Sequence, residues 1–249
     1  MPVELIVADD CSTDGTTRIA ASFGARILTG PLPLLDARVQ AARASSTGSV
    51  VLLDSDQILR PGVLHRSVAM LETFDALVLA ETSCPPSTWM SALFAADKRL
   101  VHHLSGHHLS PSGGLLPRVF KREVLLHALN ALPDPVRRVA VAQDHAIIWS
   151  EVAKITTSVG IVPNAVLHEE MTTLAELWRK YFRWGAGLPS LFETAPEYRQ
   201  MTHRAVRARL HRGDAPTGDF LRSMALLAIK TLPYGLGFAY GKAVQWRGE

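Results

Sequence analysis

Two apolar runs near the start of the chain each end in a pair of acidic residues. Val3–Asp9 reads VELIVAD and is followed by Asp10, and Ser49–Asp54 reads SVVLLD and is followed by Ser55 and Asp56. Short runs that are apolar at nearly every position are typical of strands buried on both faces of a parallel sheet. Two carboxylates this close repel each other, so each pair predicts a positive partner, most often a divalent cation. These runs therefore constrain the fold and the chemistry together.

Helical segments separate these runs from one another and from later ones. Helices are predicted after Asp14 and over 34–46 and 62–74, and further strands over 25–28, 75–80 and 158–168. Strands that alternate with helices favour an α/β fold with a mostly parallel, Rossmann-like sheet flanked by helices. Ligands of such sheets bind at the carboxyl ends of the strands. Both aspartate pairs fall at such ends.

The composition indicates a globular protein with an anionic partner. The chain has 249 residues, 47% of them hydrophobic, which suits one large domain or one domain with an appendage. Its pI of about 9.0 and its arginine-rich second half favour nucleotide phosphates or anionic lipid headgroups. No motif that reads nucleic acid is present, so nucleic acid ranks lowest. The composition leaves the identity of the anion open.

The N-terminal sequence and the cysteine content predict a cytoplasmic location. Acidic residues interrupt any signal peptide, and no uncharged run reaches the roughly 18 residues of a membrane span. Cys11 and Cys84 form no metal-binding pattern and no disulfide framework, which suits a reducing compartment. Binding at the inner face of the membrane is compatible with the basic charge.

The second aspartate pair has two interpretations. Asp54 and Asp56 follow a predicted buried strand and precede Pro61 and Gly62, which favours a ligand site over simple capping of the next helix. Hard oxygen ligands suit Mg²⁺ or Mn²⁺, which usually share their coordination shell with substrate phosphates. A D-x-D sequence also occurs by chance, so the prediction of a ligand site depends on its position after a buried strand.

Four segments taken in order resemble a known family. They read ELIVADDCSTDGT, ASSTGSVVLLDSDQILRPG, AQDHAIIW, and VLH followed by RKYFRWGAG. The series resembles the family 2 glycosyltransferases of the GT-A fold over roughly residues 3–190, and the ordered series is more specific than any one segment. The resemblance implies a nucleotide-diphosphate sugar donor, an acceptor hydroxyl, Mg²⁺ or Mn²⁺, and an inverting reaction.

The resemblance also implies roles for individual residues. The first aspartate pair would hold the nucleotide base, the residues around the second pair the ribose and diphosphate, and the aspartate of the later segment would be the catalytic base. The implied nucleotide-sugar ligands are Asp9, Asp10, Arg38, Asp54 and Ser55, the metal ligands are Asp56 and His168, and the catalytic base is Asp144. On the residues alone, Asp144 could be a solvated helix residue or a cap, and His168 a structural histidine at a strand end.

The chain departs from the family pattern at several places. Gln143 replaces the usual acid before Asp144, Cys11 stands where glycine is common, and the asparagine beside Arg38 is missing. The usual first strand of the family also has no counterpart. Because that strand is central in the family's sheet, we expect its two neighbours to lack hydrogen-bonding partners.

Two other functions compete with glycosyl transfer. A receiver domain of a response regulator also carries an acidic pair, an aspartate after a strand and a later Thr or Ser, but it requires a lysine that is missing here. A non-catalytic nucleotide-sugar binder is the other alternative, since the first strand is absent. Phosphorylation of Asp54 would favour the receiver, and donor binding without turnover the binder.

The second half of the chain contains three further features. Histidines at 102, 103, 107 and 108 favour an acceptor-side loop over a zinc site, because Gly106 interrupts the helix that ligation would need. Aromatic and basic residues alternate over 178–184, where a helix with one core face and one basic face is the simpler interpretation. The basic groups would also suit diphosphate or lipid phosphate.

The C-terminal region is predicted to be a helical extension. We expect residues 1–189 to form the catalytic domain and residues 190–249 to form a basic and apolar extension. Pro233 should divide the segment from Phe220 to Trp246 into two short helices. These helices either lie at a membrane interface, where a lipid-linked or polysaccharide acceptor would be reached, or pack back onto the catalytic core.

Overall fold

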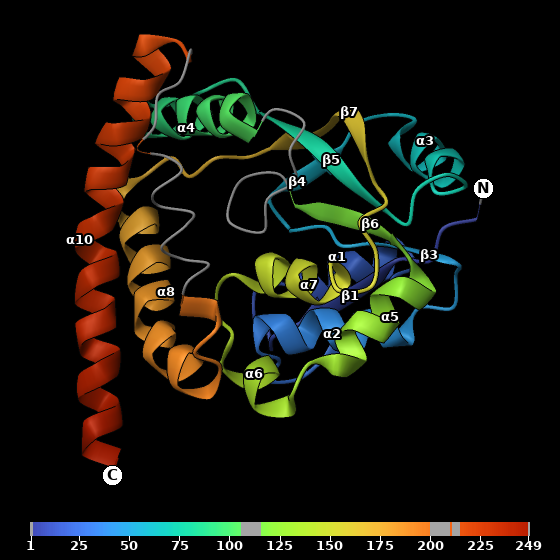
Figure 1. Cartoon of the computed structure of the whole chain (residues 1–249), viewed down its shortest axis with the longest axis horizontal. Helices are drawn as coiled ribbons and strands as arrows, with labels where there is room; N and C mark the ends of the chain where they lie inside the picture. Colours follow the sequence, from blue (N-terminus) through green and yellow to red (C-terminus); the bar gives the residue numbers. More distant parts are fainter. Residues whose placement is uncertain (1, 106–115, 200–209, 211–214, 249) are drawn as a thin grey trace.

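The computed structural model describes residues 2–105, 116–199, 210 and 215–248 (Figure 1). Helices surround a sheet on one side of the molecule, and a long C-terminal helix lies along the opposite side. The α/β class and the helical C-terminal extension are therefore confirmed. The strands are β1 (Ile6–Asp9), β2 (Arg26–Thr29), β3 (Ser49–Val51), β4 (Gln57–Leu59), β5 (Ala76–Ser83), β6 (Pro117–Lys121) and β7 (Val159–His168). The helices are α1 (Thr16–Ser22), α2 (Leu34–Ala44), α3 (Val63–Met70), α4 (Trp89–Ser105), α5 (Arg122–Ala131), α6 (Asp134–Val139), α7 (Asp144–Val152), α8 (Leu174–Thr194) and α10 (Thr217–Gly248).

The sheet is mixed, which corrects the expectation of a mostly parallel one. β1 pairs with β2 in parallel, and five other strands form a sheet of order β3-β6-β5-β7-β4. Within that sheet only β5 and β7 run parallel, whereas β6 is antiparallel to β3 and β5, and β4 is antiparallel to β7. The antiparallel partners β4 and β6 are only three and five residues long. Strands this short show no clear periodicity, so the sequence pattern did not reveal them.

The two sheets meet at edges that share no hydrogen-bonded ladder. Among the described residues, β1 pairs only with β2, and β3 pairs only with β6. As expected, β1 and β3 therefore each have one edge without a hydrogen-bonded neighbour among the described residues. The side chains of β1 are correspondingly only half-buried before Asp9, and α1 has no buried residue.

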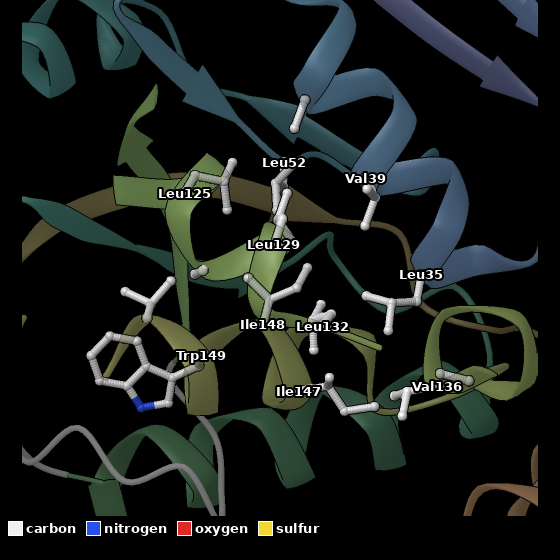
Figure 2. Close-up of a cluster of buried hydrophobic side chains, with 14 of the residues drawn as sticks. Leu35, Val39, Leu52, Leu125, Leu129, Leu132, Val136, Ile147, Ile148 and Trp149 are labelled. Atoms are coloured by element: carbon white, nitrogen blue, oxygen red, sulfur yellow. The ribbon is translucent and has the colours of Figure 1, made fainter. Parts of the chain in front are cut away.

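The sheet has an apolar core on each face because successive strand residues point to opposite sides. Ala76 pairs with Phe120, and both lie in the cluster formed with α2, α5 and α7. The next pair, Leu77 and Val119, belongs to the other cluster, which packs under α3. In the first cluster, side chains from α2, α5 and α7 converge with Leu52, Leu132 and Val136 (Figure 2). The labelled residues are Leu35, Val39, Leu52, Leu125, Leu129, Leu132, Val136, Ile147, Ile148 and Trp149.

The C-terminal segment forms one continuous helix, so the expected break at Pro233 is wrong. Pro233 lies inside α10 and is buried. α10 packs along α8 and, near its start, against α4 (Figure 1), and this tertiary packing outweighs the local cost of the proline. In the described part of the chain, no helix is both long and apolar enough to cross a bilayer.

Glycines allow α8 and α10 to approach each other closely. A Cβ atom added to Gly237 would lie 2.1 Å from the carbonyl oxygen of Phe182, and one added to Gly241 would lie 2.3 Å from that of Ala186. Because both neighbours are backbone atoms, a side chain here would force the helices apart.

We expect Gly237→Ala to destabilise the protein by about 1–3 kcal/mol through overpacking at this crossing. Gly235→Ala is the matched control, because Gly235 lies on the exposed side of the same helix with nothing within 4 Å. Alanine there should stabilise the helix by up to about 1 kcal/mol. Chemical denaturation measures both free energies of unfolding, and equal effects of the two substitutions would contradict the close approach.

Candidate functional site

The first aspartate pair closes β1 and shapes the loop that follows. Asp9 is buried and its Oδ2 accepts a hydrogen bond from the backbone N–H of Ser12 at 3.0 Å. Asp10 is exposed, and its Oδ1 accepts from the backbone N–H of Leu32 at 3.0 Å. Asp14 binds the backbone N–H of Thr16 at 3.1 Å, as expected for a residue at the start of a helix. The Asp9 side chain thus shapes its own loop, and Asp10 links that loop to the one after β2.

Three residues predicted from separate segments meet in one ion-paired group. Arg38 of α2 donates from Nε to Asp144 and from Nη2 to Asp54. Arg38 and Asp144 are buried, and Asp54 is partly buried in the loop after β3. Asp144 is the first residue of α7 and follows Gln143, whose backbone is left-handed with φ of 64°. The turn at Gln143 therefore directs Asp144 toward Arg38 and Asp54.

A second arginine and a histidine complete this group. Arg118 of β6 donates from Nη1 to Asp54 Oδ2 at 2.8 Å and contacts His145 Nε2 at 2.7 Å. Burial first, and then the charge of Arg118, lowers the pKa of His145, so the imidazole is neutral at pH 7. Because a guanidinium only donates, Nε2 accepts and the proton lies on Nδ1. Nδ1 is buried and has no hydrogen-bond partner among the described residues.

The neighbouring cations keep Asp54 ionised. Burial alone would raise the pKa of Asp54, but the neighbouring His145 and the charges of Arg118 and Arg38 outweigh it and hold that pKa well below its ordinary value. Asp144 Oδ2 is bound to Arg38, whereas Asp144 Oδ1 accepts no hydrogen bond in the part of the chain that the structure describes. This oxygen is therefore available to a proton donor.

Asp56 and His168 face each other across the β4–β7 pairing. Gln57 pairs with His168 in register, which brings Asp56 Oδ1 within 3.6 Å of His168 Nε2. Asp56 Oδ1 is buried and has no hydrogen-bond partner among the described residues. His168 Nδ1 lies 3.4 Å from Glu170 Oε1, so a second carboxylate lies on the far side of the imidazole ring. Ser55 is exposed in the intervening turn.

The Asp56 and His168 atoms fit two ligands of one cation. A separation of 3.6 Å can be spanned by two bonds of about 2.1 Å to a single ion. A third acidic, histidine or cysteine ligand is lacking within the described ranges, where no group of three such residues could hold an ion. Oxygens of a bound substrate would have to complete the shell.

A chain of ion pairs missed by sequence reasoning links these two groups. Glu81, at the end of β5, accepts from Gln57 at 2.8 Å and pairs with Arg118 at 3.1 Å. Lys98 of α4 lies between Glu81 and Glu170, at 3.1 and 3.0 Å. Burial raises the pKa of Glu170, but the hydrogen bond with His168 and the charge of Lys98 outweigh it and bring the pKa to about 2. The carboxyl-end position of Glu81 was the signal that could have identified it.

A cavity of about 280 Å³ adjoins this chain of charges at the end of β5. Glu81, Lys98, Arg99 and His102 contribute its polar wall. Of the predicted histidine tract, His107 and His108 lie outside the described residues, as does the side chain of His103.

The aromatic and basic segment forms part of α8. Tyr181 packs against the cluster shared by α4 and α10, and Phe182 lies 5.6 Å from Tyr240, centroid to centroid. Lys180 lies 5.1 Å from the Trp184 ring, and its Nζ is 4.0 Å from Asp56 Oδ2. Tyr181 and Phe182 therefore pack against neighbouring helices, Trp178 is exposed, and one basic side chain lies close to the second aspartate pair.

The family comparison decides the class of the N-terminal part. Residues 1–87 match the family model described as glycosyl transferase family 2. The family predicted from the ordered motifs is confirmed over this range, which includes Asp9, Asp10, Arg38, Asp54 and Asp56. A search of curated protein sequences finds no match.

Two solved proteins are similar in fold to most of this chain at low sequence identity. Residues 1–349 of TarS of S. aureus, in complex with UDP-GlcNAc, are 11% identical with a TM-score of 0.49, and the alignment covers 93% of this chain and 72% of that TarS chain. Glucosyl-3-phosphoglycerate synthase of Mycobacterium tuberculosis in complex with UDP is 22% identical with a TM-score of 0.45, covering 76% of this chain and 68% of the synthase. The structure of the same synthase with Mn²⁺, UDP-glucose and phosphoglyceric acid is 21% identical with a TM-score of 0.42, and the coverage of both chains is the same. All three scores lie below 0.5, so no residue role is transferred from them.

Proposed function

We propose that the protein transfers a sugar from a nucleotide-diphosphate donor to an acceptor hydroxyl. The observation that carries this proposal is the ion-paired group of Arg38, Asp54 and Asp144 beside the facing pair Asp56 and His168. A site for such a donor needs a cation-binding carboxylate and a separate carboxylate that can accept a proton. Both lie here at adjoining strand and helix ends.

The proposal assigns the donor to the loops after β1 and β3. Asp9 and Asp10 bind the nucleotide base, while Asp54 and Ser55 bind the ribose, with Arg38 holding Asp54 in place. Asp56 and His168 hold Mg²⁺ or Mn²⁺, whose charge stabilises the diphosphate leaving group. The complex of the M. tuberculosis synthase with Mn²⁺ and UDP-glucose supports this choice of cation and donor.

Asp144 is the proposed catalytic base of an inverting reaction. Its Oδ2 is fixed by Arg38, so its Oδ1 can accept the proton of the incoming hydroxyl without the side chain rotating away. His145 is neutral and is bound through Arg118, so it adds no competing positive charge beside that oxygen.

The acceptor reaches the site from the side of α4 and of the cavity at the end of β5. A lipid-linked or polysaccharide acceptor suits a cytoplasmic enzyme that works at the inner face of the membrane. In this proposal residues 1–189 form the catalytic domain and residues 190–249 its extension.

The open edges of β1 and β3 favour one second candidate, a nucleotide-sugar binder without turnover. The experiment that separates the two incubates the chain with Mn²⁺ and radiolabelled UDP-glucose or UDP-N-acetylglucosamine. Release of UDP in excess over the enzyme, with water as the acceptor, is the expected result. Stoichiometric donor binding without release would favour the binder, and the absence of both would overturn the proposal.

A further inference from the structure

The long helix α10 has one face fixed against the molecule. Asp97 of α4 accepts from Ser223 Oγ at 2.6 Å and lies 3.3 Å from Lys230 Nζ, and all three groups are buried. Gly237 and Gly241 bring the second half of the helix against the backbone of α8. The rotation of α10 about its own axis is therefore set, and so is the face that it turns outward.

That outward face is an apolar stripe. Each residue of an α-helix is rotated by about 100° from the one before it. On this basis the side chains of the stripe all point within roughly 60° of one direction. The stripe extends for roughly 33 Å along the helix. We call its members the outer stripe: Leu221, Ala225, Ala228, Leu232, Gly235, Leu236, Ala239 and Ala243. All are exposed, and the three leucines expose 60%, 58% and 47% of their surface. Figure 1 shows α10 along one side of the molecule.

Positive charges border the outer stripe on both sides. Arg222 and Lys242 are exposed and lie about 80° to either side of its centre line. No acidic residue occurs between Leu221 and Val244. The hydroxyl of Thr231, at the edge of the stripe, donates to the carbonyl of Leu227 at 2.7 Å and so needs no water.

We propose that the outer stripe lies on the surface of a membrane that contains anionic lipids. An apolar face with cationic borders matches the acyl and headgroup layers of such a surface, and the helix lies parallel to it. In a dimer formed through the stripe, Arg222 and Lys242 of both copies would place four positive charges at one interface. The stripe contains no acidic side chain that could pair with them. Charge complementarity therefore selects the anionic membrane over a dimer.

The test measures flotation of the full chain with phosphatidylcholine vesicles that contain phosphatidylglycerol. The chain is expected to float with these vesicles, less at high salt, and less with pure phosphatidylcholine. The double variant Leu232→Gln and Leu236→Gln should lower the bound fraction at least about tenfold, because two exposed leucines no longer enter the acyl layer. Ile19→Gln with Val68→Gln is the matched control, since both side chains are exposed on other helices.

Four results would overturn the proposal. They are no flotation of the unaltered chain, flotation that does not depend on anionic lipid, equal loss in the stripe and control variants, and a dimer in light scattering that the stripe variant converts to monomer. Circular dichroism checks that the variants fold, so a loss of flotation reports on the stripe. Flotation is measured without donor or acceptor, so a failure of this proposal can be distinguished from a failure of the proposed reaction.

Discussion

Replacing Asp56 with asparagine is expected to lower turnover of the nucleotide-sugar by about 10³-fold or more, because a neutral amide is a poor ligand for a hard cation and the diphosphate charge is then left uncompensated. Asp56 Oδ1 is buried, lacks a hydrogen-bond partner among the described residues and lies 3.6 Å from His168 Nε2. Initial rates of UDP release from UDP-glucose, measured against Mn²⁺ concentration, give the effect. Removal of the metal with a chelator should reduce the unaltered enzyme to a similar level.

Glu72→Gln provides the control for the Asp56 experiment. Glu72 is exposed in the turn after α3, and its substitution changes the net charge by the same amount. It should leave the rate and its Mn²⁺ dependence unchanged. A rate in Asp56→Asn that still rises with Mn²⁺ as in the unaltered enzyme would contradict the assignment of the cation to Asp56.

Asp144→Asn should lower turnover by about 10²- to 10⁴-fold while leaving donor affinity nearly intact, since the amide cannot accept the proton of the incoming hydroxyl. The hydrogen bond from Arg38 can be kept by the amide oxygen, so the loop geometry should persist. Titration calorimetry with UDP and Mn²⁺ measures the affinity, and UDP release measures the rate.

Asp134→Asn is the matched control for Asp144. Asp134 is likewise the first residue of a helix, α6, but its side chain is 61% exposed. Asp134→Asn should change neither the affinity for UDP nor the rate of UDP release. A collapse of UDP affinity in Asp144→Asn, or a rate close to that of the control, would mean that Asp144 serves binding or structure instead of proton transfer.

The sequence analysis identified Arg38 and the aspartates of the candidate site, but not the residues that connect its two halves. Asp54, Asp144 and Arg38 come from segments up to 106 residues apart, and they were brought together through the ordered family motifs. Arg118, Glu81 and Lys98 were missed, although they connect the two halves of the site. Their pairing depends on which strands are neighbours, and the antiparallel insertion of β6 beside β5 left no local pattern to read.

Rules that predict helix and strand ends from local sequence also failed where tertiary packing determines those ends. Pro233 signals the end of a helix, yet α10 continues because its two halves are held against α4 and α8. The strand after Ser49 was predicted to run to Asp54, whereas β3 ends at Val51 and the chain turns before β4. Gln57 Oε1 accepts from the backbone N–H of Asp54 at 3.0 Å and shapes that turn, a contact that apolar periodicity cannot indicate.

A crystal structure with Mn²⁺ and UDP tests the central claim most directly. The account predicts an anomalous manganese peak within bonding distance of Asp56 Oδ1 and His168 Nε2, with the diphosphate completing its shell and the base near Asp9 and Asp10. Asp144 should remain bound to Arg38, with Oδ1 facing the position of the donor sugar. Manganese and UDP bound away from Asp56, or UDP bound there with Asp144 turned away from the diphosphate, would contradict it.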